Sequence, residues 1–190
     1  MTSKNKVITP EVKLHTDILF SKPQDERVDF AEKDLVELFP YGLSLSNDTT
    51  RPFMILKDKA QELVLPVPIN QLEAGVTLTQ SAHLSAPVTL HKFSESLLKS
   101  LDIKLERCVF VEIKGVHQYV RLYMSGHPQY HSMKFRADEV MSLCIHLKVS
   151  IFATKNIINR SKEMSAEMVA LAETAQNSPM SLVKTHQYLM

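Results

Sequence analysis

The sequence has few of the residues on which disulfide-linked, nucleotide-cradling and zinc-binding scaffolds depend. It contains only two cysteines and four glycines in 190 residues. Cys108 and Cys144 lie in apolar runs, which predicts reduced thiols in a core rather than a disulfide framework. The chain has no Gly-rich phosphate loop, no nucleophile elbow and no His-Glu-x-x-His helix. Nucleotide-cradling and zinc-protease mechanisms are therefore not expected, and neither is an organic cofactor.

Long apolar runs are also missing. No stretch approaches the roughly 20 apolar residues that a membrane-spanning helix requires, and residues 1–17 lack the apolar core of a signal peptide. The composition is 44% hydrophobic and 23% charged with a net charge of +1, which is typical of a soluble globular chain. We therefore expect a cytoplasmic protein with no membrane partner.

The near-neutral total hides an uneven distribution of charge. Residues 1–89 carry 9 Lys/Arg and 12 Asp/Glu, whereas residues 90–160 carry 11 Lys/Arg and 6 Asp/Glu. A nucleic-acid-binding face needs a basic patch of this kind, although so small an excess also arises from ordinary scatter of surface charge.

Periodicity divides the chain into three parts. Residues 1–33 are polar and broken by prolines, and we interpret them as an N-terminal arm. Residues 34–160 alternate short β-rich segments with amphipathic helical segments, which predicts an α+β domain with antiparallel or mixed sheet meanders. Residues 161–190 are expected to form a C-terminal helix and a tail. The methionines of that helix predict core packing, with a protein partner as the alternative.

The two halves of the central domain follow the same order of strands and then a helix with a glutamate in its first turn. Glu73-Ala74 corresponds to Glu139-Val140, 66 positions further along. This order predicts an internal duplication of a strand-rich unit that ends in a helix.

Carboxylates at these two helix starts are the main candidates for chemistry. Glu73 and Glu139 occupy equivalent positions, Asp138 is beside Glu139, and His91 begins another predicted helix. A few carboxylates with waters can hold Mg²⁺, and phosphodiester hydrolysis uses such an ion. The alternative is structural, since an acidic residue in the first turn also complements the helix dipole.

Three motifs resemble the bifunctional nuclease domain family. Residues 65–69 read Leu-Pro-Val-Pro-Ile and are followed by Glu73-Ala74, where the family has Leu-Pro-Ile and then Glu-Ala. Leu90-His91-Lys92 occupies the place of a Thr-His-Asp motif. Residues 136–139, Arg-Ala-Asp-Glu, correspond to Arg-Pro-Ser-Asp, and the strand at 150–153 follows at the expected distance.

This resemblance implies an α+β fold, a homo-oligomer and metal-assisted cleavage of DNA or RNA. The implied site has Glu73, Asp138 and Glu139 as ligands of Mg²⁺ or Mn²⁺, His91 as acid/base or phosphate contact, and Arg136 as an anion clamp beside Glu139.

The chain departs from the family pattern in ways that leave an alternative open. Lys92 stands where the family has Asp, and a cation repels a metal. A shift of one residue would instead align Thr89 with the family Thr and put His91 at the Asp position. The alternative is a domain that kept the fold but lost catalysis, and that acts as a binding or regulatory module through oligomer or partner interfaces.

Overall fold

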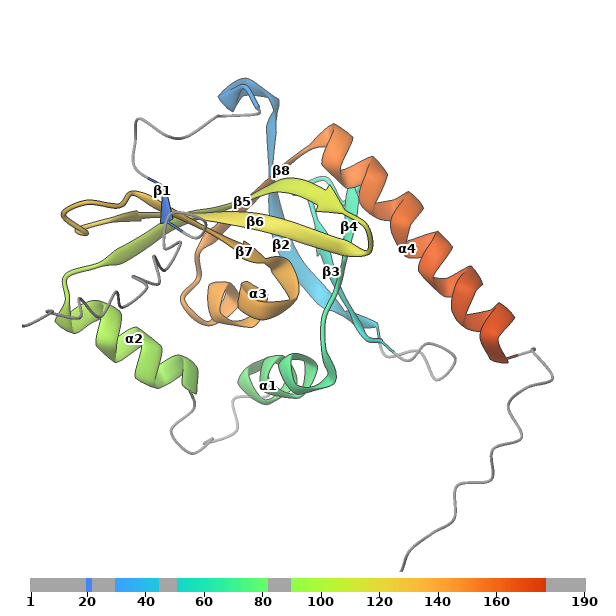
Figure 1. The fold of residues 1–190 in the computed structure, drawn as a ribbon, viewed down its shortest axis with the longest axis horizontal. Coiled ribbons are helices and arrows are strands. Elements are labelled where there is room, and N and C mark those ends of the chain that lie inside the picture. The colour runs from blue at the N-terminus through green and yellow to red at the C-terminus, as the bar shows by residue number, and fades with distance from the viewer. Residues whose placement is uncertain (1–19, 22–29, 45–50, 82–89, 177–190) are drawn as a thin grey trace, which may run out of the picture.

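In the part of the chain that the structure describes, one curled sheet carries four α-helices (Figure 1). The computed structural model describes residues 20–21, 30–44, 51–81 and 90–176. The elements are β1 Phe20–Ser21, the 3₁₀ turn η2 Glu32–Asp34, β2 Leu35–Ser44, β3 Phe53–Lys57, β4 Val64–Pro68, α1 Gln71–Ser81, α2 Leu90–Ser100, β5 Lys104–Lys114, β6 His117–Ser125, β7 Ser132–Arg136, α3 Ala137–His146, β8 Ser150–Thr154 and α4 Lys155–Gln176.

The sheet consists of two antiparallel meanders joined by one parallel pair. Its eight strands run in the order β1-β7-β6-β5-β8-β2-β3-β4. Only β5 and β8 are parallel among the pairs described, and β8 is antiparallel to β2 on its other side. The predicted α+β fold with a mixed sheet is confirmed. Each meander is followed by a helix that starts with an acidic turn, α1 and α3, but the internal duplication stays a prediction.

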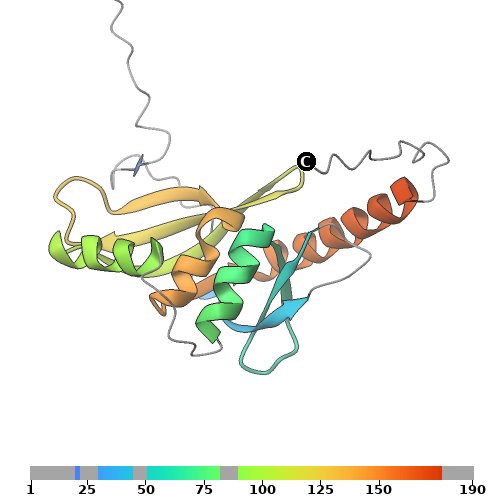
Figure 2. The same ribbon diagram turned by 90° about the horizontal axis from the view of Figure 1, so that it is seen from below.

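Helices α1, α2 and α3 lie side by side across one face of the sheet (Figure 2). Helix α4 packs against β4, β5 and β8 instead. The main core lies between the sheet and α3, with further side chains from α4. Its fully buried large side chains include Leu38, Met54, Leu56, Leu65, Ile69, Phe110, Leu122, Met141, Ile151 and Ile158.

Both cysteines are buried and unpaired, as the sequence predicts. The thiols of Cys108 on β5 and Cys144 on α3 are joined by a hydrogen bond. This bond, together with burial, raises the pKa of the Cys108 thiol well above its usual range. Both residues act as small core side chains at the contact between helix and sheet.

Side-chain caps fix where α1 and α4 begin. Asn70 caps α1, since its Oδ1 accepts a hydrogen bond of 2.7 Å from the amide of Glu73. The C-terminal helix was expected within residues 161–190, but α4 starts at Lys155, directly after β8. The reason is a second cap, because Thr154 Oγ1 accepts from the amide of Ile157 at 3.3 Å. The expected boundary at residue 160 therefore falls inside α4.

The first half of α4 belongs to the core. Ile157, Ile158 and Met164 are buried, and the hydroxyl of Ser161 bonds back to the carbonyl of Ile157 at 2.7 Å. Met164 thus serves core packing, as its periodicity predicts, whereas the side chain of Met168 lies outside the described residues. In the part of the chain that the structure describes, no helix combines the length and apolar character needed to cross a membrane.

Candidate functional site

Polar side chains at four-residue spacing meet where α1, α2 and α3 pack together. Helix α3 contributes Asp138, Ser142 and His146, one from each successive turn. Helix α2 contributes His91 and Glu95 at the same spacing, and α1 contributes Glu73 from its first turn. These six residues are referred to below as the three-helix cluster.

Ser142 is the centre of the cluster. Its hydroxyl donates to Glu73 Oε2 and lies 3.2 Å from His91 Nε2. A serine hydroxyl has one proton to donate, so a serine that donates to Glu73 must accept from the N–H of His91. The bonds therefore run from His91 Nε2–H to Ser142 Oγ–H to the Glu73 carboxylate. Both Ser142 and His91 are buried, whereas Glu73 is partly exposed.

The surroundings of Glu73 and His91 both favour the neutral form of the side chain. Burial, with a smaller contribution from the negative charge of Asp138, raises the pKa of Glu73 above its usual value. Burial, together with the charge of His146, lowers the pKa of His91. Near neutral pH the cluster thus combines a carboxyl group that holds its proton more tightly than usual with a neutral imidazole.

Asp138 sits at the start of α3 between two arginines. Arg136 Nε donates to Oδ1 at 2.9 Å and Arg136 Nη2 donates to Oδ2, while Arg51 Nη2 donates to Oδ2 at 2.5 Å. Burial acts to raise the pKa of Asp138, but the hydrogen bond to Arg136 and the charges of Arg136, Arg51 and His117 outweigh it. The pKa is therefore below its usual value, and Asp138 is a carboxylate near neutral pH.

Replacing Asp138 by alanine is expected to lower the free energy of unfolding at neutral pH by about 2 kcal/mol, because two partly buried guanidinium groups lose their partner. Urea unfolding followed by circular dichroism measures this difference. The ionised carboxylate stabilises the fold above its usual pKa, and that stabilisation is lost as the pH falls through the lowered pKa of the folded state.

The difference in the free energy of unfolding between wild type and Asp138→Ala should therefore become smaller below about pH 4. Asp138→Asn is the control. It keeps the shape of the side chain and one acceptor oxygen, so its free energy of unfolding should fall less than that of Asp138→Ala. Equal stability of Asp138→Ala and wild type at neutral pH would show that the arginines do not depend on Asp138.

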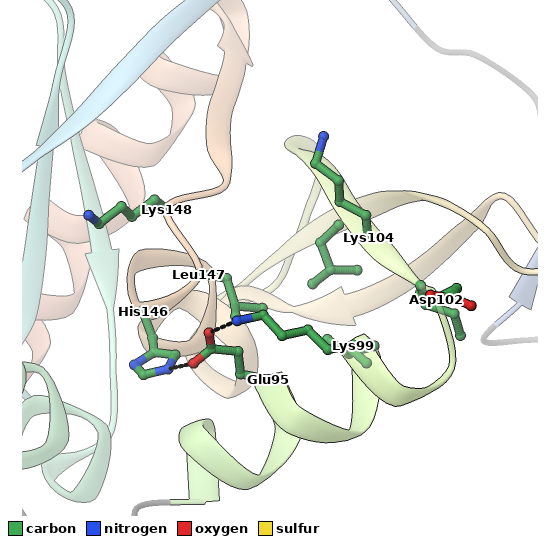
Figure 3. A pocket seen from close by; sticks show the side chains of 10 residues that line it. Glu95, Lys99, Asp102, Lys104, His146, Leu147 and Lys148 are labelled. Atoms are coloured by element: carbon green, nitrogen blue, oxygen red, sulfur yellow. Dashed lines mark hydrogen bonds and ion pairs between the residues drawn. The ribbon is translucent and has the colours of Figure 1, made fainter.

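At the opposite end of the cluster, Glu95 fixes His146. Its carboxylate accepts from Lys99 at 2.6 Å and lies 3.1 Å from His146 Nε2 (Figure 3). It also accepts from Lys92 at 3.0 Å. The bonds to Lys99, Lys92 and His146 lower the pKa of Glu95 to about 2. The ring of His146 is then held 5.8 Å from that of His91.

A pocket of about 610 Å³ lies beside Glu95 and His146, where α2 and α3 end (Figure 3). Its charged rim includes Lys99, Lys104 and Lys148. Because carbonyl groups give a helix C-terminus a negative potential, Lys99 near the end of α2 and Lys148 just after α3 complement the two helices.

Glu139 points away from the three-helix cluster. Its side chain is exposed and lies 3.8 Å from Arg136 Nε, and it lines a separate pocket on the sheet. The structure thus brings Glu73 and His91 together through Ser142, and Arg136 together with Asp138, but it places Glu139 on the other flank of Arg136.

The three carboxylates that the sequence suggested as metal ligands do not form a metal cage as they are arranged. Both oxygens of Asp138 are bonded to arginine, Glu73 is bonded to Ser142, and Glu139 faces a different pocket. Among the residues that the structure describes, no group of three or more His, Cys, Asp or Glu side chains could hold a metal ion. Metal binding by Glu73, Asp138 and Glu139 stays a prediction, and it would require Asp138 to leave its arginines.

The sequence interpretation overlooked four participants, namely Ser142, His146, Glu95 and Arg51. A signal existed for three of them, because Asp138-Ser142-His146 and His91-Glu95 repeat at four-residue intervals in helical segments. Arg51 carried no such signal, since it lies 87 residues before Asp138.

A carboxyl group with a raised pKa, a Ser-His pair and two arginines are the components of an acid/base site for an anionic substrate. The sequence profile of the bifunctional nuclease domain matches residues 54–166, from β3 into α4. The chain therefore belongs to the bifunctional nuclease domain family, and it contains a nuclease-like domain. No match to a curated protein was found.

Proposed function

We propose that the protein hydrolyses phosphodiester bonds of nucleic acid at the start of α3. The observation that carries the proposal is that Glu73, backed by Ser142 and His91, lies next to Asp138 with its two arginines. Family membership supports the same class of substrate.

Each group has a chemical role in this proposal. The partly exposed Glu73 acts as general acid and protonates the leaving oxygen, since its surroundings favour the protonated form. Ser142 and His91 orient Glu73 through the bonds that join the three residues, and the partly exposed Glu73 regains its proton from solvent. A guanidinium has five N–H donors, so Arg136 can hold Asp138 and a phosphate oxygen at the same time. His91 thus acts through Ser142 rather than by direct contact with substrate, because its side chain is buried.

The alternative, a binding or regulatory module without hydrolysis, is favoured by two observations. The first is that both oxygens of Asp138 are already bonded to arginine, and that Lys92 places a cation beside the cluster, where it pairs with Glu95. The second is an apolar stripe on the outer side of α2, of the kind that packs against another protein surface or a second copy of the chain. The stripe consists of Leu90, Phe93, Leu97 and Leu101, all exposed. The predicted homo-oligomer and a partner at the C-terminal helix belong to this alternative.

Purified protein is expected to cleave single-stranded DNA or RNA, with more activity in Mg²⁺ or Mn²⁺ than in EDTA if the predicted metal dependence is correct. The assay follows the shortening of an end-labelled oligonucleotide on a denaturing gel. Glu139→Gln tests the predicted ligand role of Glu139, and it should abolish the activity only if Glu139 binds the metal. Absence of cleavage with every divalent metal would contradict the proposal and favour the binding module.

A further inference from the structure

The face of the β5–β6–β7 meander that points away from α3 carries a pocket of about 390 Å³. On β6, Gln118 and Val120 are buried against the core, so Tyr119 between them points to the opposite face of the sheet. The residues that line this pocket, here called the Tyr119 pocket, are Glu112, Lys114, Tyr119, Lys134, Phe135, Arg136 and Glu139.

Strand register places Tyr119 in the middle of the pocket. Tyr119 is paired with Glu112 on β5 and with Arg136 on β7, so the three side chains form a row across the strands. Lys134 lies two residues before Arg136 on β7 and therefore points to the same face. It donates to the Glu112 carboxylate, and its Nζ lies 5.3 Å from the Tyr119 ring centroid. An aromatic ring is therefore fixed among cations on a rigid sheet.

The charge of the Tyr119 pocket suits a phosphate group beside the ring. Three cations, Lys114, Lys134 and Arg136, face two carboxylates, Glu112 and Glu139, which leaves a net positive charge. Arg136 is shared with the candidate site, because the same guanidinium bonds Asp138 at 2.9 Å. A strand bound in the pocket would thus continue towards Asp138 and Glu73.

A tyrosine ring on a sheet face recognises a nucleobase by stacking, and stacking needs a base that is not already stacked in a duplex. Cations around the ring contact the backbone of the same strand. The geometry points to the Tyr119 pocket as the binding site for an unpaired nucleotide, so that the partner is single-stranded nucleic acid. This inference rests on the proposed function and specifies its substrate class.

A second tyrosine on the same sheet provides the comparison. Tyr41 on β2 is exposed, and Lys57 Nζ lies 3.4 Å from its ring centroid. The pocket beside it is lined by Lys57 and Lys59 but also by Glu37 and Asp58, so its charges cancel. Tyr41 thus offers a ring with a neighbouring lysine but without excess positive charge, and without contact to the candidate site.

The test measures the binding of a fluorescein-labelled oligothymidine to the full chain by fluorescence anisotropy, in EDTA and at fixed salt. Tyr119→Ala is expected to weaken binding about tenfold, the effect of losing one stacked base. Tyr119→Phe keeps the ring and should bind within about twofold of wild type. Tyr41→Ala should bind like wild type, and a duplex of the same length should bind more weakly. Thermal unfolding of each variant verifies that it is folded.

The inference is overturned if Tyr119→Ala binds the oligonucleotide as tightly as wild type does. It is also overturned if Tyr119→Phe or Tyr41→Ala loses as much affinity as Tyr119→Ala. It is also overturned if the duplex binds as tightly as the single strand, or if a polyglutamate peptide competes as well as unlabelled oligothymidine, which would show a general anion site. Cleavage is not part of this measurement. Tyr119-dependent binding without any nuclease activity would refute the proposed function and leave this inference standing.

Discussion

Replacing Glu73 by glutamine is expected to reduce nucleic-acid cleavage by at least about 100-fold, the usual contribution of a general acid. Glutamine has nearly the same shape and can still accept the hydrogen bond from Ser142, but it has no proton to give to a leaving oxygen. The measurement is the initial rate of oligonucleotide cleavage at saturating substrate. Glu163→Gln, an exposed change on α4, is the matched control and should keep the wild-type rate.

The same variant should be no less stable than wild type, which separates lost chemistry from lost folding. The folded protein raises the pKa of Glu73, so the contribution of this carboxyl to stability is present at low pH and is lost as the pH rises through the raised pKa. Glutamine is neutral at every pH, so the variant avoids the unfavourable ionisation of this partly buried carboxyl group. A Glu73→Gln protein that is clearly less stable at neutral pH, or that cleaves at the wild-type rate, would contradict the assignment of Glu73 as a partly exposed general acid.

Gly126→Ala is expected to lower the free energy of unfolding by about 3 kcal/mol. Gly126, in the turn between β6 and β7, has φ +87°, a backbone conformation that residues with a side chain rarely adopt. A Cβ there would lie 1.9 Å from the backbone oxygen of Asp102, just after α2, so one backbone segment has to move. Chemical denaturation of the variant measures the loss.

Two other glycines distinguish the contribution of backbone strain from that of the steric contact. Gly115 has φ +58° with open space around its Cα, so Gly115→Ala should cost only the backbone strain, about 1 kcal/mol. Gly42 has neither a positive φ nor a close neighbour, and Gly42→Ala should leave stability within about 0.5 kcal/mol of wild type. If Gly126→Ala lost no more than Gly115→Ala, the contact between the turn and the end of α2 would be looser than the structure shows.

Local patterns were sufficient to predict most of the fold. Three features of the structure correspond to local sequence signals: Asn70 is a residue type that caps helices, Lys114-Gly115 is typical of a hairpin turn, and apolar residues alternate along β6. Strand β5 does not show such an alternation, since Cys108, Val109 and Phe110 are all buried in succession. The physical reason is that β5 lies between β6 and β8, has a register shift after Phe110, and is covered by α4. Burial of a strand on both faces depends on which elements pack against it, and the local sequence does not specify that.

The candidate site was predictable only where one helix supplies neighbouring groups. Arg136, Asp138 and Glu139 follow one another in the chain, and their clustering around the start of α3 could be expected. Adjacent positions on a helix nevertheless point in different directions, so Asp138 turns to Arg51 while Glu139 faces the Tyr119 pocket. The hydroxyl of Ser142 became relevant only once α1 and α2 were packed on either side of it.

The position of Ser142 between Glu73 and His91 also affects how the protein takes up protons. A positive charge on His91 would favour the ionised form of Glu73, to which Ser142 joins it, whereas the negative charge on Asp138 opposes that ionisation. Groups that interact in this way release protons in steps that belong to the set rather than to single residues. The pH dependence of this protein therefore has to be described with macroscopic constants of the three-helix cluster. Each constant will change when any one member of the cluster is replaced.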